Sequence, residues 1–229
     1  MTMNMMYDFI APTEEEREFL LSCLPGADET FFRRCAMYGA YLYKTNETLN
    51  LTRIPPESFW SKHVCDALSI LRAIPDLEGG GDLCDLGCGA GIPSVILAAA
   101  LPDLSVLAMD STRKKILFVQ ETADLLSLKN LHTVHGRANE LGRKDPYQEA
   151  FDYVTARAVS DALTLASEAA GLLVPEGRLL IYRTESQAEP ETHLLRKKRI
   201  RYSLTEEFSL PADAGKRMFM ILENLPKHR

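Results

Sequence analysis

The chain has 229 residues, of which 46% are hydrophobic and 25% charged, and its formal net charge is −6. This composition is typical of a globular protein with one full α/β core and an extension, and no segment approaches the roughly 18 unbroken apolar residues of a membrane span. The acidic charge excludes a protein coated in positive potential, so any contact with nucleic acid must be local.

The N-terminal stretch MTMNMMYDFIAPTEEE has neither the basic start nor the apolar core and cleavage site of a signal peptide, so we expect a cytoplasmic protein. The cysteines form an odd set with no CxxC pair and no histidine at zinc-finger spacing, which predicts packing residues and no metal site. They are Cys23, Cys35, Cys65, Cys84 and Cys88.

Residues 1–80 are predicted to be a helical extension packed on the core. PTEEEREFLLSCL, which begins at Pro12, has the proline, threonine and acidic first turn of a helix start. ESFWSKHVCDALSILRAI, which begins at Glu57, has mostly apolar residues that recur at the helical period. They would form one face of a helix, and we expect that face to cover another part of the molecule. The face consists of Phe59, Trp60, His63, Val64, Ala67, Leu68 and Leu71.

After GGGD at residues 79–82, short apolar runs alternate with helical segments. Strands are predicted near residues 82–86, 104–110, 131–135, 151–157 and 177–183. Helices are predicted near residues 91–101, 113–127 and 160–173. This alternation is typical of a Rossmann-like, doubly wound and mostly parallel sheet. IRYSLTEEFSL and KRMFMILEN predict a C-terminal antiparallel hairpin at the sheet edge, so the second domain would be residues 81–229.

DLGCGAGIPS, residues 85–94, joins the first predicted strand to a helix, where a doubly wound sheet binds its ligand. A dinucleotide fingerprint would have its third glycine at Ile92 rather than at Gly91, and the P-loop lysine is absent. We expect Asp85 to point at the ligand, where a carboxylate repels pyrophosphate and favours an ammonium or hydroxyl group. Asp110 ends the second strand, where an acid hydrogen-bonds ribose. A ligand with a ribose, a cationic part and no phosphate is predicted, and S-adenosylmethionine fits.

The form D-x-G-x-G-x-G resembles the class I methyltransferases, which bind S-adenosylmethionine. Across nearly its whole length the chain resembles the RsmG (GidB) family of bacterial 16S ribosomal RNA guanine-N7 methyltransferases. The matching stretches are NLTRI (50–54), KHVCDAL (62–68), DLGCGAGIP (85–93), DSTRKKILF (110–118), GRANEL (136–141) and FDYVTARAV (151–159).

This resemblance implies S-adenosylmethionine as cofactor and 16S rRNA or the small ribosomal subunit as partner. Separately, we expect a monomer, and no membrane partner since no long apolar segment is present. It implies that Arg157, with Lys114 and the helix of His63, faces the RNA target and the reacting methyl group. The cofactor contacts that it implies are Asp85, Gly87, Gly89, Gly91, Ile92, Asp110, Ala138, Asn139 and Arg157.

Guanine N7 carries a lone pair and no proton, so methyl transfer to it requires orientation rather than a general base. The sequence near the glycines offers no pairing of a base with a nucleophile, which agrees with that chemistry. N7 lies on the major-groove edge, and the A-form major groove is closed to side chains, so the target must be a loop or extruded guanine. An RNA substrate also predicts activity that falls steeply with salt.

Individual residues keep alternative interpretations. Arg157 ends an otherwise apolar strand, where strand ends face the crevice, so we expect Arg157→Ala to abolish methylation with the fold intact. His63 and Asp66, one helical turn apart, are either a helix-surface pair or part of the site. Lys114 and Lys115 would be solvated residues of a first helical turn without the resemblance.

Three departures from the family pattern bear on function. The family usually has glycine at Ser94, an acid at Asn139, and Lys-Gly at residues 183–184, where this chain has Arg-Thr. Arg183 keeps the charge with a different shape. The most basic run, LRKKRIRY at residues 195–202, is either an rRNA contact or a solvated surface.

Other functions remain open at this point. A methyltransferase for a small molecule or a protein would turn over without RNA. A non-catalytic module that keeps the fold for RNA binding or ribosome assembly would bind without forming product. A nicotinamide dehydrogenase is disfavoured by the position of the third glycine.

Overall fold

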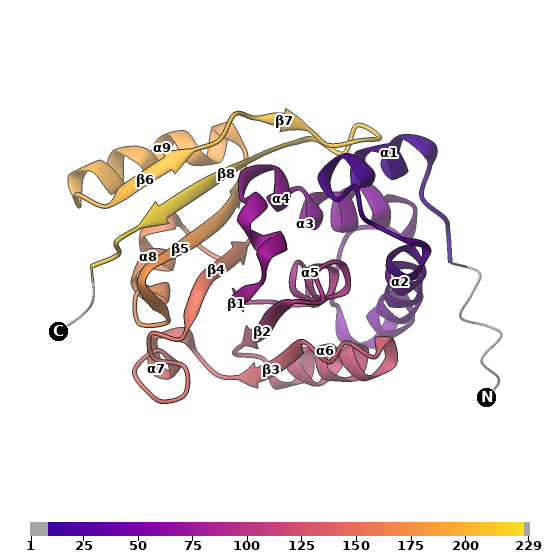
Figure 1. Cartoon of the computed structure of the whole chain (residues 1–229), viewed down its shortest axis with the longest axis horizontal. Helices are drawn as coiled ribbons and strands as arrows, with labels where there is room; N and C mark the ends of the chain where they lie inside the picture. The colour runs from indigo at the N-terminus through magenta and orange to yellow at the C-terminus, as the bar shows by residue number, and fades with distance from the viewer. Residues whose placement is uncertain (1–8, 227–229) are drawn as a thin grey trace.

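A computed structural model describes residues 9–226. One eight-stranded sheet has the order β3-β2-β1-β4-β5-β8-β6, and β7 pairs with β8 (Figure 1). The first five strands are β1 (Gly81–Leu86), β2 (Leu104–Asp110), β3 (Leu131–His135), β4 (Phe151–Arg157) and β5 (Leu173–Arg183). The last three are β6 (Arg201–Leu204), β7 (Phe208–Ser209) and β8 (Lys216–Glu223).

Strands β1 to β5 run parallel to their neighbours, and β8 is antiparallel to β5 and to β6. The predicted doubly wound, mostly parallel sheet is therefore confirmed. β1 lies between β2 and β4, which makes the carboxyl end of β1 the switch point where such sheets bind ligands.

The C-terminal strands differ in detail from the prediction. They are antiparallel as expected, but β8 inserts between β5 and β6, so the edge belongs to β6. β8 can occupy the interior because both faces of MFMIL are apolar: Phe219 faces one core, and Met218 and Met220 face the other. β5 also begins at Leu173 rather than near residue 177, across a register shift beside Phe151.

The helices that precede the sheet are α1 (Glu14–Cys23), α2 (Glu29–Leu49), α3 (Asp66–Leu68) and α4 (Ile70–Ala73). Three single-turn segments accompany them: η2 (Pro56–Ser58), η3 (Trp60–Cys65) and η4 (Pro75–Gly79). The helices between strands are α5 (Ser94–Ala100), α6 (Arg113–Leu126), α7 (Ala138–Leu141), α8 (Ala162–Ala169) and α9 (Glu185–Lys197). The start of α1 follows from its sequence, because Thr13 and Glu16 form a capping box.

Two helical predictions were incomplete. Residues 57–74 were expected to form one helix, but they fold as short pieces with a π-helical turn at η3. The predicted apolar face is buried, and so are Asp66 and Ser69 outside it, so the segment is enclosed on more than one side. No helix was predicted at α9, because its composition is polar and Pro190 interrupts it.

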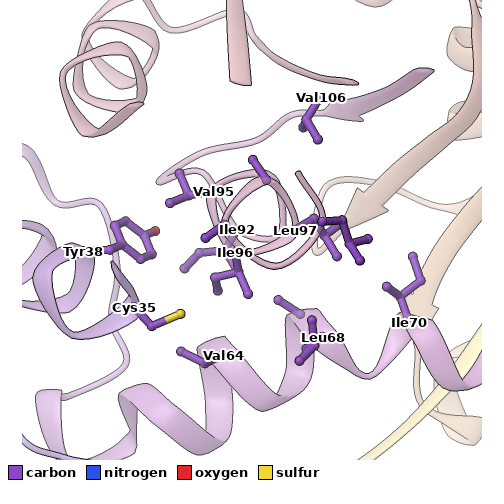
Figure 2. Packing of buried hydrophobic residues seen from close by; sticks show 14 of the residues in the cluster. Cys35, Tyr38, Val64, Leu68, Ile70, Ile92, Val95, Ile96, Leu97 and Val106 are labelled. Atoms are coloured by element: carbon purple, nitrogen blue, oxygen red, sulfur yellow. The ribbon is translucent and has the colours of Figure 1, made fainter. Parts of the chain in front are cut away.

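Alternating side chains of the strands supply two cores, one on each face of the sheet. One core joins α5 and α6 to α1, α2 and η3, and the other lies beneath α8 and α9. Helix α5 is buried on all sides: Val95, Ile96 and Leu97 lie between Val106 of β2 and the segment that carries Val64 (Figure 2). The N-terminal helices therefore form a third layer over α5.

The transition from helices to sheet coincides with the predicted boundary, since η4 ends at Gly79 and β1 begins at Gly81. The division into domains of residues 1–80 and 81–229 stays a prediction. Among the residues described, no helix combines the length and apolar character needed to cross a membrane.

Candidate functional site

A cavity of about 730 Å³ opens at the carboxyl ends of β1, β2 and β4, and we call it the ligand cavity. Its walls come from the glycine loop (residues 87–91), the ends of β2 and β4, and the segment 51–54 that follows α2. It therefore lies at the predicted switch point, and both the N-terminal helices and the sheet contribute to it.

The glycine loop exposes its backbone to the cavity. Gly87, Gly89 and Gly91 all have positive φ angles, of 72°, 57° and 87°, which side chains other than glycine rarely adopt. A Cβ on Gly87 would lie 2.8 Å from Val159 Cγ2, and one on Gly91 would lie 2.6 Å from Val95 Cγ2. Gly91 thus packs inward and does not line the cavity, whereas Gly87, Gly89 and Ile92 do. The loop forms a cradle that a ligand can approach closely.

Asp110 connects this loop to the cavity floor. One carboxylate oxygen accepts a hydrogen bond from Gly89 N at 3.0 Å, and the other accepts one from Thr112 N at 2.7 Å. Lys115 Nζ lies 3.9 Å from the first oxygen. Each carboxylate oxygen keeps a second lone pair, so Asp110 can also accept hydrogen bonds from hydroxyl groups in the cavity.

Asp85 does not point into the cavity, contrary to the expectation from the sequence. Its carboxylate is buried and accepts hydrogen bonds from Ser94 N at 3.2 Å and from Thr155 Oγ1 at 3.1 Å. These donors lie at the start of α5 and on β4, so the Asp85 carboxylate is directed toward them and away from the cavity. Burial raises the pKa of Asp85 to about 6, against the opposing effect of the hydrogen bonds. Its cofactor contact stays a prediction.

Arg157 is held at the cavity by a buried carboxylate. Its Nε donates to Asp66 Oδ2 at 2.7 Å, and its terminal nitrogen donates to the Lys62 carbonyl at 2.8 Å. Asp66 is 1% exposed and also binds Arg217, whose Nε lies 2.5 Å from Oδ1. Arg157 and Arg217 both line the cavity. Asp66 thus fixes two cations from β4 and β8 against the N-terminal helices.

His63 also lines the cavity, and it is buried. Its Nε2 lies 3.0 Å from Thr52 Oγ1, which accepts a hydrogen bond from Ile54 N at 3.1 Å. Burial, with a further contribution from Arg157, lowers the pKa of His63 to about 3, so the ring is neutral near pH 7. Because His63 and Asp66 are both buried, the helix-surface interpretation of this pair is wrong.

Besides Asp85 and Gly91, two further predicted residues lie outside the ligand cavity. Lys114 is exposed, while the adjacent Lys115 lines the cavity, since successive residues of a helix face different directions. Asn139 lines a neighbouring cavity of about 490 Å³, whereas Ala138 lines both. The roles of Lys114 and Asn139 stay predictions.

Arg183, which departs from the family pattern, is buried and lines the cavity, and hydrogen bonds hold its guanidinium in place. Its Nε donates to Glu191 Oε2 at 2.9 Å, and a terminal nitrogen donates to the Ser160 carbonyl. The charge expected at this position is therefore present, and it ties β5 to α9 and to the loop after β4.

Sequence reasoning missed Arg217. A signal was available, because a strand antiparallel to the rest begins at the edge where the parallel strands end. The first residues of β8 therefore reach the cavity, and Arg217 is the second of them. The predicted hairpin did not specify which of its strands pairs with β5, and Arg217 reaches the cavity because that strand is β8.

Comparisons with known proteins agree with this geometry. The family described as GidB, rRNA small subunit methyltransferase G, matches residues 33–219. Ribosomal RNA small subunit methyltransferase G of Oenococcus oeni is 34% identical over 180 residues, covering 77% of this chain and 74% of that protein. The protein of the same name from Limosilactobacillus fermentum is 33% identical over 222 residues, covering 93% and 91%.

Two solved structures share the fold. A SAM dependent methyltransferase from Aquifex aeolicus has a TM-score of 0.54 at 17% identity, covering 81% of this chain and 98% of that chain. A SAM-dependent O-methyltransferase from Thermotoga maritima has a TM-score of 0.53 at 15% identity, covering 82% and 73%. The fold is that of the class I methyltransferases, as expected.

Proposed function

The chain belongs to the rRNA small subunit methyltransferase G family, and we propose that it transfers a methyl group from S-adenosylmethionine to N7 of a loop guanine in 16S rRNA. The observation that carries the proposal is the pair of arginines, Arg157 and Arg217, that one buried carboxylate holds at the ligand cavity. They put positive charge beside a cradle suited to the methyl donor, in a chain whose net charge is −6.

The cavity fits S-adenosylmethionine. Gly87 and Gly89 leave room for close approach, Asp110 offers acceptor oxygens for ribose hydroxyls, and Ile92 and Ala138 supply apolar contacts for adenine. The bound donor supplies an electrophilic methyl carbon on a positively charged sulfur. Asp85 acts from beneath by tying the start of α5 to β4. We assign Arg157 to both ligands, because it lines the same cavity as the glycine loop and Asp110.

The acceptor requires orientation rather than proton removal. Guanine N7 has no proton to lose, and the neutral His63 is a weak base whose pKa is about 3. The guanidinium groups of Arg157 and Arg217 carry N–H donors for the phosphate and O6 of the target nucleotide. Because Asp66 fixes their direction before RNA arrives, less ordering remains to be done in the reactive complex. Lys114, exposed at the start of α6, would contact RNA outside the cavity.

We also propose that the protein acts as a monomer in the cytoplasm, on free 16S rRNA or on the small ribosomal subunit. Its substrate would need to present the guanine unpaired, because the arginines lie within a cavity and not on an open face.

The test is methyl transfer from radiolabelled S-adenosylmethionine to undermethylated small subunits, with a nuclease-treated control and a salt titration. We expect label only with intact RNA, and a rate at subsaturating RNA that falls at least tenfold between 50 and 200 mM salt, because phosphate contacts release counterions. Label that persists after nuclease treatment would indicate a small-molecule or protein acceptor. Tight binding of S-adenosylmethionine and RNA without labelled product would indicate a non-catalytic module.

A further inference from the structure

The strongest concentration of positive charge lies outside the ligand cavity. Between residues 196 and 201 every residue except Ile200 is basic, and all five basic side chains are exposed. They occupy the last turn of α9, the connection, and the first residue of β6. We call this stretch the distal basic segment; its basic residues are Arg196, Lys197, Lys198, Arg199 and Arg201.

Acidic residues do not neutralise this segment. None of the ion pairs found among residues 9–226 involves it. Arg196 donates to the Tyr202 hydroxyl at 2.7 Å, which is a neutral partner. Glu223 lies opposite Arg201 in the strand register without forming an ion pair. Positive charge is therefore available to an outside partner.

Local structure explains only part of this charge. Cations in the last turn of α9 complement the helix dipole, which accounts for Arg196 and Lys197. A charged residue on the edge strand discourages strand pairing between molecules, which accounts for Arg201. Neither effect requires Lys198 or Arg199. Arg199 even adopts a φ of 57°, in the position after a helix where glycine is usual.

The segment lies at the far end of α9 from the ligand cavity. Arg183, the last residue of β5, and Gln187, in the first turn of α9, line the cavity, and α9 is 13 residues long. Its length is about 20 Å at the α-helical rise. Figure 1 shows α9 running away from the centre of the molecule and β6 returning from the segment. A partner that reached both places would span roughly that distance.

We propose that the distal basic segment binds backbone phosphates of the rRNA substrate, about one α9 length from the target guanine. The inference rests on the proposed function, because it takes the occupant to be the RNA whose guanine enters the cavity. Lysine and arginine bind phosphates without reading sequence and fix the register of a nucleic acid. In a net-acidic chain, a second local contact orients the RNA along one direction from the cavity.

Two matched triple variants test this proposal. K197Q/K198Q/R201Q removes three cations from the segment. Arg196 is kept because it bonds to Tyr202, and Arg199 is kept because a substitution there could disturb its backbone conformation. R33Q/K129Q/K144Q removes three exposed cations elsewhere. For the first we expect the KM for small subunits or 16S rRNA to rise about tenfold, and the slope of log affinity against log salt to flatten by about 2. The kcat and the S-adenosylmethionine affinity should stay within twofold of wild type. The control triple should change the KM by less than twofold.

Several results would overturn the inference. If wild type methylates rRNA and both triples show the same KM and salt slope, the segment does not bind the substrate. Capture of poly-glutamate by the segment with an unchanged KM for RNA would indicate an acidic protein partner instead. If wild type methylates no rRNA, the proposed function fails by itself. Filter binding of labelled 16S rRNA then tests the segment separately. Equal affinity of the two triple variants for the RNA would exclude binding by the segment, and a loss of affinity in the first triple alone would support it.

Discussion

Asp66, in a helical segment before the sheet, holds two arginines of the ligand cavity in place. Its carboxylate accepts from Arg157 and Arg217, and all three side chains come from different parts of the chain. A buried charge is tolerated only when it is paired and hydrogen-bonded, and Asp66 satisfies both conditions. Removing the carboxylate would leave two arginines facing each other at the cavity.

The first prediction concerns Arg157→Ala. Activity should fall by two orders of magnitude or more, because the arginine orients the reacting groups. The fold should survive, since Asp66 keeps Arg217 at two nitrogens. Initial rates on rRNA and a thermal melt measure the two effects. Arg157→Lys is the control that keeps charge without the planar donor geometry, and it should recover only part of the rate. A rate within tenfold of wild type in Arg157→Ala would remove this residue from the site.

The second prediction is a pH dependence at Asp85. Its folded pKa of about 6 exceeds the ordinary 3.8, so the folded protein holds this proton more tightly than the unfolded chain does. The resulting stability is complete below about pH 4 and is lost as pH rises through 6. Asp85→Asn cannot titrate, so its free energy of unfolding relative to wild type should rise by roughly 2 kcal/mol between pH 4 and pH 7. Urea unfolding at several pH values measures this, and a difference that does not vary with pH would contradict it.

Several residue-level expectations could be reached from the sequence alone. The loop between the first strand and its helix lies at the ligand cavity, and Asp110 lines that cavity, both as expected. The orientation of Asp85 could not be predicted, since it depends on donors from α5 and β4 that only the fold brings together. The choice between Lys114 and Lys115 likewise depends on how α6 is rotated against the sheet.

At the scale of elements, the N-terminal helices support the glycine loop directly. The Tyr38 hydroxyl, on α2, donates to the Ala90 carbonyl at 2.7 Å, and Tyr38 is fully buried. The Tyr182 hydroxyl, on β5, makes a similar bond to the Ala67 carbonyl at 2.8 Å. These contacts connect the helical layer to the cavity from two sides.

The third prediction follows from the Tyr38 contact. Tyr38→Phe leaves a buried carbonyl unpaired within the glycine loop, which should lower the free energy of unfolding by about 1–3 kcal/mol. The looser loop should weaken S-adenosylmethionine binding severalfold in calorimetric titration. Tyr41→Phe on the same helix is the control, because the Tyr41 hydroxyl bonds to Glu121 and Thr45 and not to the glycine loop. Equal affinities in the two variants would show that α2 does not support the loop.

Elements were predictable where one pattern dominated. The bounds of β2 and β4 agree with the apolar runs that predicted them, because buried parallel strands are nearly continuous apolar runs. Those of the edge strand β3 also agree, although only Leu131 in it is buried. The prediction missed α9, whose polar residues form no clear stripe, and it treated η3 as part of a regular helix. The insertion of β8 between β5 and β6 depends on pairing between distant segments, which local pattern does not contain.

At the scale of the molecule, the two predicted domains share one hydrophobic core. Leu20, Tyr38 and Leu68 from the N-terminal helices belong to the same cluster as Ile96 of α5 and Val106 of β2. Without the helices, α5 would expose apolar side chains to water on its outer side. We therefore expect the chain to unfold as one unit.

The fourth prediction tests that expectation with residues 81–229 alone. The fragment should lack a cooperative thermal transition and should bind dyes specific for exposed apolar surface, because it loses the layer that covers α5. Full-length protein should show one transition by circular dichroism and by tyrosine fluorescence. A fragment that unfolds cooperatively would establish residues 81–229 as an independent domain.

The most direct measurement is the chemical position of the transferred methyl group. Undermethylated small subunits would be incubated with labelled S-adenosylmethionine and either wild type or Arg157→Ala. The RNA would then be mapped by borohydride reduction and aniline cleavage, which cut at N7-methylguanine. The proposed function predicts cleavage at one unpaired guanine of 16S rRNA with wild type and loss of that cleavage in the variant. Label at another atom, or on another molecule, would contradict it.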